Sequence, residues 1–215
     1  MADGRMGEAP SIKGVLLSKL VDDIRALLER SEADRERLGA GLSAESLVLL
    51  EGKVEITHWY PIEQYVELTE LIWKEQGGNR VEYLQRRGEN AMERLMQGGI
   101  YQQIDYLNRQ DGGLRTLPSR SELLRSCRLV GSIYGALLNF TTQTWDWDPE
   151  NPDILLHQVH QAAHYPEVLR HVQEGALTCL VRLARPDAPA VVSERVAPDH
   201  IVFTYDYTGV FETRE

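Results

Sequence analysis

The hydrophobic periodicity of the sequence changes near residue 138. Before it, apolar residues recur at steps of three and four, the spacing of helices with one buried stripe. After it, β-branched and aromatic residues come in short runs separated by Pro, Asp and Asn, which is typical of strands. Together they predict an α+β fold: an N-terminal helical region followed by a mostly antiparallel four-stranded sheet with an inserted helix.

On the N-terminal side of residue 138 the periodicity predicts four helices with recognisable ends. Ser11 is interpreted as the N-cap of the first, and Ser119 and Glu122 have the spacing of a capping box at the fourth. A short apolar run at 47–50 is of undetermined type, and a loop is expected at 111–113. Gly88 falls on an apolar stripe, which predicts close approach of another backbone. The four helices are expected at 11–30, 61–77, 79–97 and 119–137.

On the C-terminal side of residue 138, a pair of hairpins flanks one helix. Pro149 and Pro152 punctuate the first turn, and Pro198 lies in the second. Trp145 and Trp147 alternate with Asp146 and Asp148, so we expect the indoles on one face of a strand and the carboxylates on the other. The strands are expected near 139–147, 153–160, 191–196 and 200–207, with the helix at 166–183.

Length and composition indicate one domain at 11–207, between a disordered arm at 1–10 and a tail at 208–215. The net charge of −10 disfavours nucleic acid and anionic lipid as partners. No segment has the length and hydropathy of a membrane span, and the first ten residues lack the apolar core of a signal peptide. Cys127 and Cys179 lie far apart and are interpreted as free thiols. These features predict a cytoplasmic protein.

Four histidines, at 157, 160, 164 and 171, are the strongest candidates for a metal site. Pro166 interrupts any continuous helix through them. If residues 153–160 form a strand, His157 and His160 point to opposite faces and cannot share an ion. We therefore expect no metal, and no cofactor. Nucleophile-elbow, dinucleotide-binding and phosphate-loop patterns are absent from the sequence, which predicts a protein that is not an enzyme.

Three segments in order carry a resemblance to a known family. They are Ile12-Lys-Gly14-Val-Leu-Leu, then Trp59-Tyr60-Pro61 followed by a helix with Leu84 and Gly88, then the closing hairpin–helix–hairpin. Over residues 11–207 this order resembles the haem-NO/oxygen-binding superfamily. Its haem-free relatives include vinyl-reductase-type ligand-binding domains, vesicle-tethering TRAPP subunits and an uncharacterised paralogous family expanded in myxobacteria, which the chain resembles most.

The resemblance also implies where haem would be held. Haem-binding members use a helical His downstream of the segment matching 59–88, and a Tyr-x-Ser-x-Arg motif for the propionates. Here no His occurs between His58 and His157, and Ser193-Glu194-Arg195 is preceded by Val191 where the motif has Tyr. Haem binding of that type is therefore not expected.

Two functions are compatible with these observations. One is a non-enzymatic sensory or carrier module that binds a small apolar ligand in a helix–sheet cavity, as the resemblance implies. The other is a scaffold with a filled core that acts through dimerisation or partner binding. The candidate ligand-binding residues are aromatic: Trp59, Tyr60, Tyr65, Trp73 and Tyr134.

The first helix is apolar over an unusually wide arc. A flanking stripe of Leu17, Val21 and Leu28 accompanies its main stripe. We expect this stripe to be the interface of a homodimer, or of a complex with a similar subunit.

Overall fold

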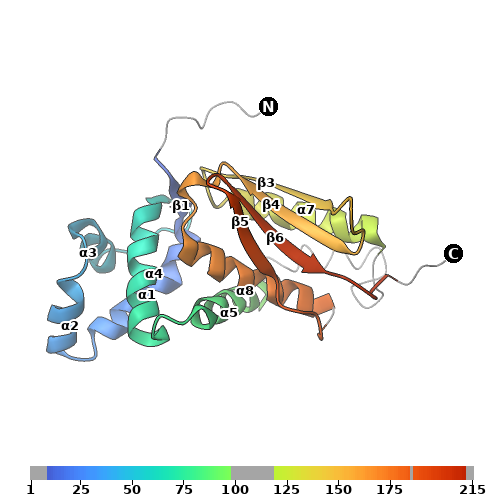
Figure 1. Cartoon of the computed structure of the whole chain (residues 1–215). Helices are drawn as coiled ribbons and strands as arrows, with labels where there is room; N and C mark the ends of the chain where they lie inside the picture. Colours follow the sequence, from blue (N-terminus) through green and yellow to red (C-terminus); the bar gives the residue numbers. More distant parts are fainter. Residues whose placement is uncertain (1–8, 98–118, 185, 212–215) are drawn as a thin grey trace. The chain divides into compact units, whose positions relative to one another are not determined.

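The computed structural model describes residues 9–97, 119–184 and 186–211, and the chain divides into two compact units (Figure 1). Unit 1 comprises Met1–Arg80 and Tyr134–Phe140, and unit 2 comprises Val81–Ile133 and Thr141–Glu215. The chain passes from unit 1 to unit 2 and returns to unit 1 for seven residues.

Unit 1 begins with a strand in place of the expected helix. Ser11 is not an N-cap: residues 11–13 form β1, and Lys13 is the N-cap of α1. The reason is tertiary pairing, because Ile12 lies opposite Tyr60 in β2 and also forms a bridge with Leu138. Pro10 belongs to this arrangement, since its carbonyl accepts from the Ile62 amide at 3.0 Å. Pro10, expected in a disordered arm, therefore belongs to the folded chain.

Of the remaining helices of unit 1, the helix expected at 61–77 is confirmed, whereas the helix at Glu32–Gly39 was not predicted. Pro61 is the N-cap of α4, and Gly78 ends it in the left-handed conformation, as the Gly77-Gly78 pair predicts. The apolar run at 47–50 lies in α3, which packs on α1 and α4. The elements are β1 (Ser11–Lys13), α1 (Gly14–Leu28), α2 (Glu32–Gly39), α3 (Ala44–Glu51), β2 (Trp59–Pro61) and α4 (Ile62–Gly77).

Unit 2 contains the predicted sheet, which is antiparallel in the order β3-β4-β6-β5. The two hairpins and the inserted helix are confirmed, and the chain has the predicted α+β fold. The elements are α5 (Val81–Gln97), α7 (Arg120–Gly135), β3 (Thr142–Trp147), β4 (Ile154–His160), η1 (Ala162–His164), α8 (Glu167–Ala184), β5 (Val192–Ala197) and β6 (His200–Asp206).

The helices α5 and α8 lie side by side at a crossing made by two glycines (Figure 1). A Cβ at Gly88 would overlap the Val172 carbonyl, and one at Gly175 would overlap the Gln85 carbonyl. Each glycine therefore admits the backbone of the other helix. The close approach predicted at Gly88 is confirmed.

Other local predictions can be checked at the ends of elements. Ser119 and Glu122 form the capping box: the Glu122 amide donates to Ser119 Oγ at 3.3 Å, and the Ser119 amide to Glu122 Oε2 at 2.7 Å. The loop at 111–113 lies outside the described residues. Within the described ranges no helix is long and apolar enough to cross a membrane.

Candidate functional site

The five aromatic residues predicted to bind a ligand lie on three elements, β2, α4 and α7. Trp59 and Tyr60 are half-buried in β2, where Lys13 Nζ lies 4.0 Å from the Trp59 ring centroid and the Tyr60 hydroxyl accepts from the Glu55 amide at 2.9 Å. Trp73 instead closes the turn after α4, because its indole N–H donates to the Arg80 carbonyl at 2.8 Å.

Tyr65 and Tyr134 are the two members of the set that lie close together. Tyr65 is buried. Burial of the Tyr134 hydroxyl raises its pKa above the usual value, and the nearby Tyr65 raises it further. Tyr65 and Trp73 are eight residues apart on α4, about 12 Å along its axis. Among the five, Tyr65 is the side chain that is buried, and the other four are half-buried.

The flanking stripe of α1 is buried within the chain. Leu17 and Val21 are both fully buried, and Leu28 is half-buried. The helices α2, α3 and α4 all contact α1. A partner cannot reach Leu17 or Val21 without unfolding this packing, so the wide apolar arc is explained within one chain. The dimer stays a prediction, without these two side chains as its surface.

The strongest candidate site is an aromatic stack on the inner face of the unit 2 sheet. His157 lies between two rings: Trp145 is parallel to it with centroids 4.0 Å apart, and Phe203 is 5.2 Å away. All three side chains are buried. They come from β3, β4 and β6 at paired register positions, so the antiparallel ladder aligns them.

The protonation state of His157 follows from its hydrogen bond with Gln143. Nε2 lies 3.0 Å from Gln143 Oε1, an oxygen that can only accept, so Nε2 carries the proton and Nδ1 presents a lone pair. Burial lowers the pKa of His157 to about 3, which keeps the ring neutral. Nδ1 is buried and, within the described residues, has no hydrogen-bond partner. Among the described residues the stack thus presents an unpartnered acceptor, His157 Nδ1, and an unpartnered donor, Trp145 Nε1, inside an aromatic, buried environment.

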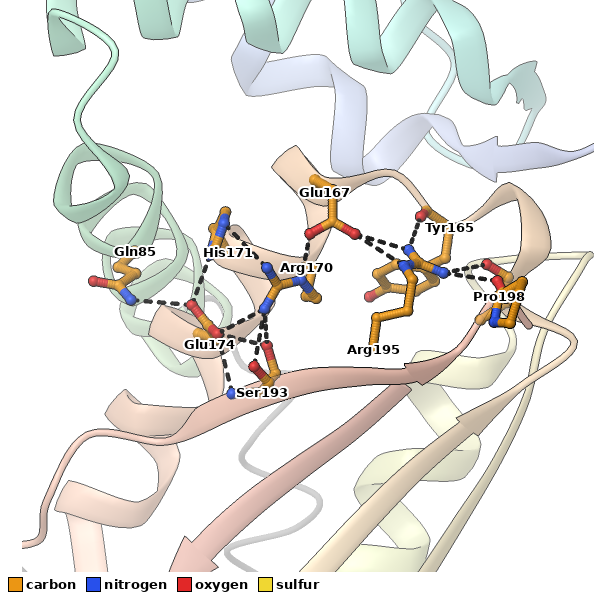
Figure 2. Close-up of polar contacts among 10 residues, drawn as sticks. Gln85, Tyr165, Glu167, Arg170, His171, Glu174, Ser193, Arg195 and Pro198 are labelled. Carbon is orange, nitrogen blue, oxygen red and sulfur yellow. Dashed lines mark hydrogen bonds and ion pairs between the residues drawn. The ribbon is translucent and has the colours of Figure 1, made fainter. Parts of the chain in front are cut away.

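A second polar cluster, which sequence reasoning missed, is centred on Glu174 of α8 (Figure 2). Its carboxylate is buried and accepts from five donors on α5, α8 and β5. They are Gln85 Nε2 at 3.0 Å, His171 Nδ1 at 2.9 Å, Arg170 Nη1 at 3.4 Å, the Ser193 amide at 3.1 Å and Ser193 Oγ at 2.5 Å. Burial raises the pKa of Glu174, but these hydrogen bonds outweigh it and lower the pKa to about 2.

The order of contacts in this cluster differs from that of a catalytic triad. In a triad the His lies between the nucleophile and the carboxylate. Here the carboxylate lies between, because Ser193 and His171 each bind a different oxygen of Glu174. The Ser193 hydroxyl donates to the ionised Glu174 and accepts from Arg170 Nη1 at 2.7 Å, and among the described residues no histidine contacts it. The cluster connects α5, α8 and β5.

The cluster holds the free edge of the sheet against α8. β5 is an edge strand, and at Ser193 its amide binds Glu174 while its carbonyl accepts from Arg170 Nη1 at 3.0 Å. Two side chains of α8 thus take the place of a further strand, which blocks edge pairing there. Arg195 extends the contact by donating to the carbonyls of Ala162, Tyr165 and Pro198 (Figure 2).

These contacts also test whether the residues fit haem. Ser193 and Arg195, nearest to the propionate motif, are held by Glu174, Glu167 and three backbone carbonyls. His171 of α8 is bound to Glu174 through Nδ1. On α7, burial raises the pKa of the Cys127 thiol to about 12, so it is protonated. The residues present do not fit haem held in the manner that the resemblance implies.

The histidine arrangement predicted from sequence is confirmed in its geometry. His157 is buried on the inner face of β4, whereas His160 lies on the other face and stacks on His200 with centroids 4.6 Å apart. Among the residues that the structure describes, no group of three His, Cys, Asp or Glu is placed to hold a metal ion. The alternation expected at 145–148 holds within β3, with Trp145 buried, Asp146 exposed and Trp147 half-buried, and Asp148 lies beyond the end of the strand.

Comparison with known proteins gives the fold. No family model and no curated protein matches the chain. Among solved structures, the Fe(II) unliganded H-NOX protein from K. algicida aligns with a TM-score of 0.57 at 14% identity, over 91% of this chain and 96% of its own. A point mutant of that protein aligns with a TM-score of 0.54 at 12% identity, over the same shares. The chain has an H-NOX-like fold, as its sequence resemblance indicates.

Proposed function

We propose that the chain is a non-enzymatic sensory module that binds a small, mostly apolar molecule at the aromatic stack of unit 2. The observation that carries the proposal is the unpartnered Nδ1 of His157, buried between Trp145 and Phe203. Buried polar atoms in folded proteins nearly always have a partner, and ligand sites combine apolar walls with a few such atoms. Because Nδ1 accepts, the ligand would carry a hydrogen-bond donor.

Two further observations support this proposal. The solved structures that share the fold are described as unliganded proteins of a family named for binding a ligand, which is an argument from fold alone. The polar cluster at Glu174 has the contacts of a structural tie and lacks the order of a nucleophile, base and acid. The first observation favours a binding module and the second disfavours hydrolysis by Ser193.

Native mass spectrometry of freshly purified protein tests the proposal. The expected result is a species heavier than the bare chain by the mass of one small molecule, which is lost on denaturation. His157→Leu should abolish the added mass because it removes the acceptor. The matched control is His160→Leu on the opposite face of the same strand, which should retain it. A wild-type chain at its bare mass, or retention by His157→Leu, contradicts the proposal.

The second candidate is a scaffold with a filled core. It is favoured by the tight packing of Trp145, since a Cβ at Gly131 would overlap its indole nitrogen. It is also favoured by exposed apolar side chains in unit 1, where Val48 is 68% and Ile56 58% exposed. The same spectra distinguish the two functions, because a scaffold would show bare chains or oligomers of bare chains.

A further inference from the structure

A second group of aromatic rings in unit 2 surrounds a cation. Trp147 at the end of β3, Tyr207 after β6, and Phe211 contact one another with centroids 5.6 to 5.9 Å apart. The guanidinium carbon of Arg120 lies 5.8 Å from the Trp147 ring centroid and 5.3 Å from that of Phe211. Its Nη2 forms an ion pair with Asp153. Two ring systems and one carboxylate thus converge on one guanidinium group.

The backbone holds these groups in place. The Tyr207 amide donates to the Asp153 carbonyl at 2.9 Å, which fixes the strand end that carries the carboxylate beside the rings. The Val210 amide donates to the Tyr207 carbonyl at 2.9 Å, and Gly209 has a φ of +75°, so the chain turns back and brings Phe211 onto Trp147. Residues 208–211, expected to be a tail, therefore belong to this aromatic cluster.

A second arginine on the same helix shows what an ordinary surface pair looks like. Arg128 of α7 pairs with Asp146 at 2.6 Å, and both side chains are 57% exposed. In the part of the chain that the structure describes, no aromatic ring stacks on it. Arg120 and Asp153 are less exposed, at 38% and 31%, and two rings lie against the Arg120 guanidinium. The difference lies in the aromatic walls, which attract a cation through their faces and exclude water from the ion pair.

We propose that Trp147, Phe211 and Asp153 form a guanidinium-recognition site, with Tyr207 supporting the rings and the chain's own Arg120 as the resident ligand. Arg120 is the first residue of α7. Occupation of the site therefore latches the start of α7 to the ends of β3 and β4 and to the turn after β6. With the side chain of residue 120 shortened, the same site accepts a free guanidinium ion, and the latch is open.

Chemical rescue of Arg120→Ala tests this site. The probe is ethylguanidinium chloride at millimolar concentration, titrated at constant ionic strength and followed by the indole N–H resonance of Trp147. We expect a saturable shift in Arg120→Ala, none in the wild type, whose site is filled, and none in the matched control Arg128→Ala. Urea, a neutral planar analogue, should give no saturable shift in Arg120→Ala. A linear shift, or equal shifts in all three proteins, overturns the proposal.

A measurement of the latch keeps the proposal testable if Arg120→Ala folds poorly. Amide hydrogen exchange of residues 123–125, the first amides of α7 with a main-chain acceptor one turn back, should accelerate about fivefold in Asp153→Asn, the factor that a partly exposed cation–π and ion-pair contact contributes. Arg120→Lys keeps the charge without the planar group and should accelerate exchange less. If Asp153→Asn exchanges at the wild-type rate, as Arg128→Ala is expected to, the contact of Arg120 with Asp153 does not hold the start of α7. That result overturns the proposal.

Discussion

Two carboxylates, one in each unit, bind serine residues in similar ways but in different surroundings. Glu67 of α4 accepts from the Ser43 amide and hydroxyl, both at 2.6 Å, and from the Ser46 hydroxyl, and so fastens the start of α3. Glu174 of α8 accepts from Ser193 in the same manner, but is buried and also binds side chains of two helices. Glu67 fastens one helix end, whereas Glu174 joins three elements.

The difference in burial sets what each carboxylate contributes. Burial raises the pKa of both groups, and hydrogen bonds then lower it below the usual value, to about 2 for Glu174. Loss of a partly exposed cap leaves groups that water can reach, while loss of a buried acceptor leaves its donors unsatisfied. The same chemistry therefore has a larger effect on stability in unit 2.

Isosteric replacement of each carboxylate tests this comparison directly. Glu174→Gln should lower the free energy of unfolding by about 3–5 kcal/mol, because it leaves Arg170 and Ser193 facing a neutral amide in a buried site. Glu67→Gln should cost about 1 kcal/mol, the usual effect of a weakened helix cap. Urea unfolding of the two variants measures both values. Equal losses would show that burial does not distinguish the two sites.

A glycine replacement tests whether unit 2 depends on its helix crossing as well as on Glu174. Gly88→Val should destabilise the protein by about 3 kcal/mol, because its side chain would overlap the Val172 carbonyl and separate α5 from α8. Gly135→Ala is the matched control, since a Cβ there meets no described atom within 4 Å. Thermal unfolding followed by circular dichroism measures the difference, and a Gly88→Val protein as stable as the control would refute the dependence.

Mild acid gives a smaller effect that also belongs to unit 2. The folded pKa of His157 is about 3, below its unfolded value near 6.5, so the unfolded chain binds a proton that the folded chain does not. Stability should therefore fall as the pH drops below about 6, with a slope that approaches about 1.4 kcal/mol per pH unit. Above about pH 5.5 this loss belongs to His157, because Glu174, whose ordinary pKa is 4.5, contributes only at lower pH. The residues that contact His157 are Gln143, Trp145 and Phe203, which are uncharged and do not oppose the loss of stability. His157→Phe should flatten the slope in urea titrations at each pH, while His160→Phe should leave it unchanged.

The fold could be predicted from sequence wherever the signal is local. The capping box at Ser119 and the prolines of the two hairpins act within a few residues, and the structure has them as expected. The strand at Ser11 could not be predicted in this way, because its partners are Pro61 and Asn139, far along the chain. The prediction that Leu17 lies at an interface is wrong for the same reason: helical periodicity identifies a wide apolar arc but not how many neighbours cover it.

The sites were harder to predict than the fold. The sequence identifies His157 as a histidine on one face of a strand, but its stacking on Trp145 depends on strand register, which the sequence leaves open. Glu174 escapes prediction because Gln85 and Ser193 lie 89 and 19 residues from it. One sequence signal for this cluster was present. Arg170 and Glu174 have the i, i+4 spacing of a helical ion pair, and the neighbouring Gly175 lies where α8 packs closely on another helix.

The return of residues 134–140 to unit 1 affects how the protein can be made. The Lys13 amide binds the Leu137 carbonyl, and the Ser11 amide binds the Asn139 side chain. A ribosome adds residues at roughly 5–20 per second, so the stretch from Arg80 to Asn139 takes roughly 3–12 s. During that interval α1 to α4 have been synthesised, but one edge of β1 is unpaired because residues 137–139 have not yet been added. A chaperone that binds exposed strand edges would act in this interval.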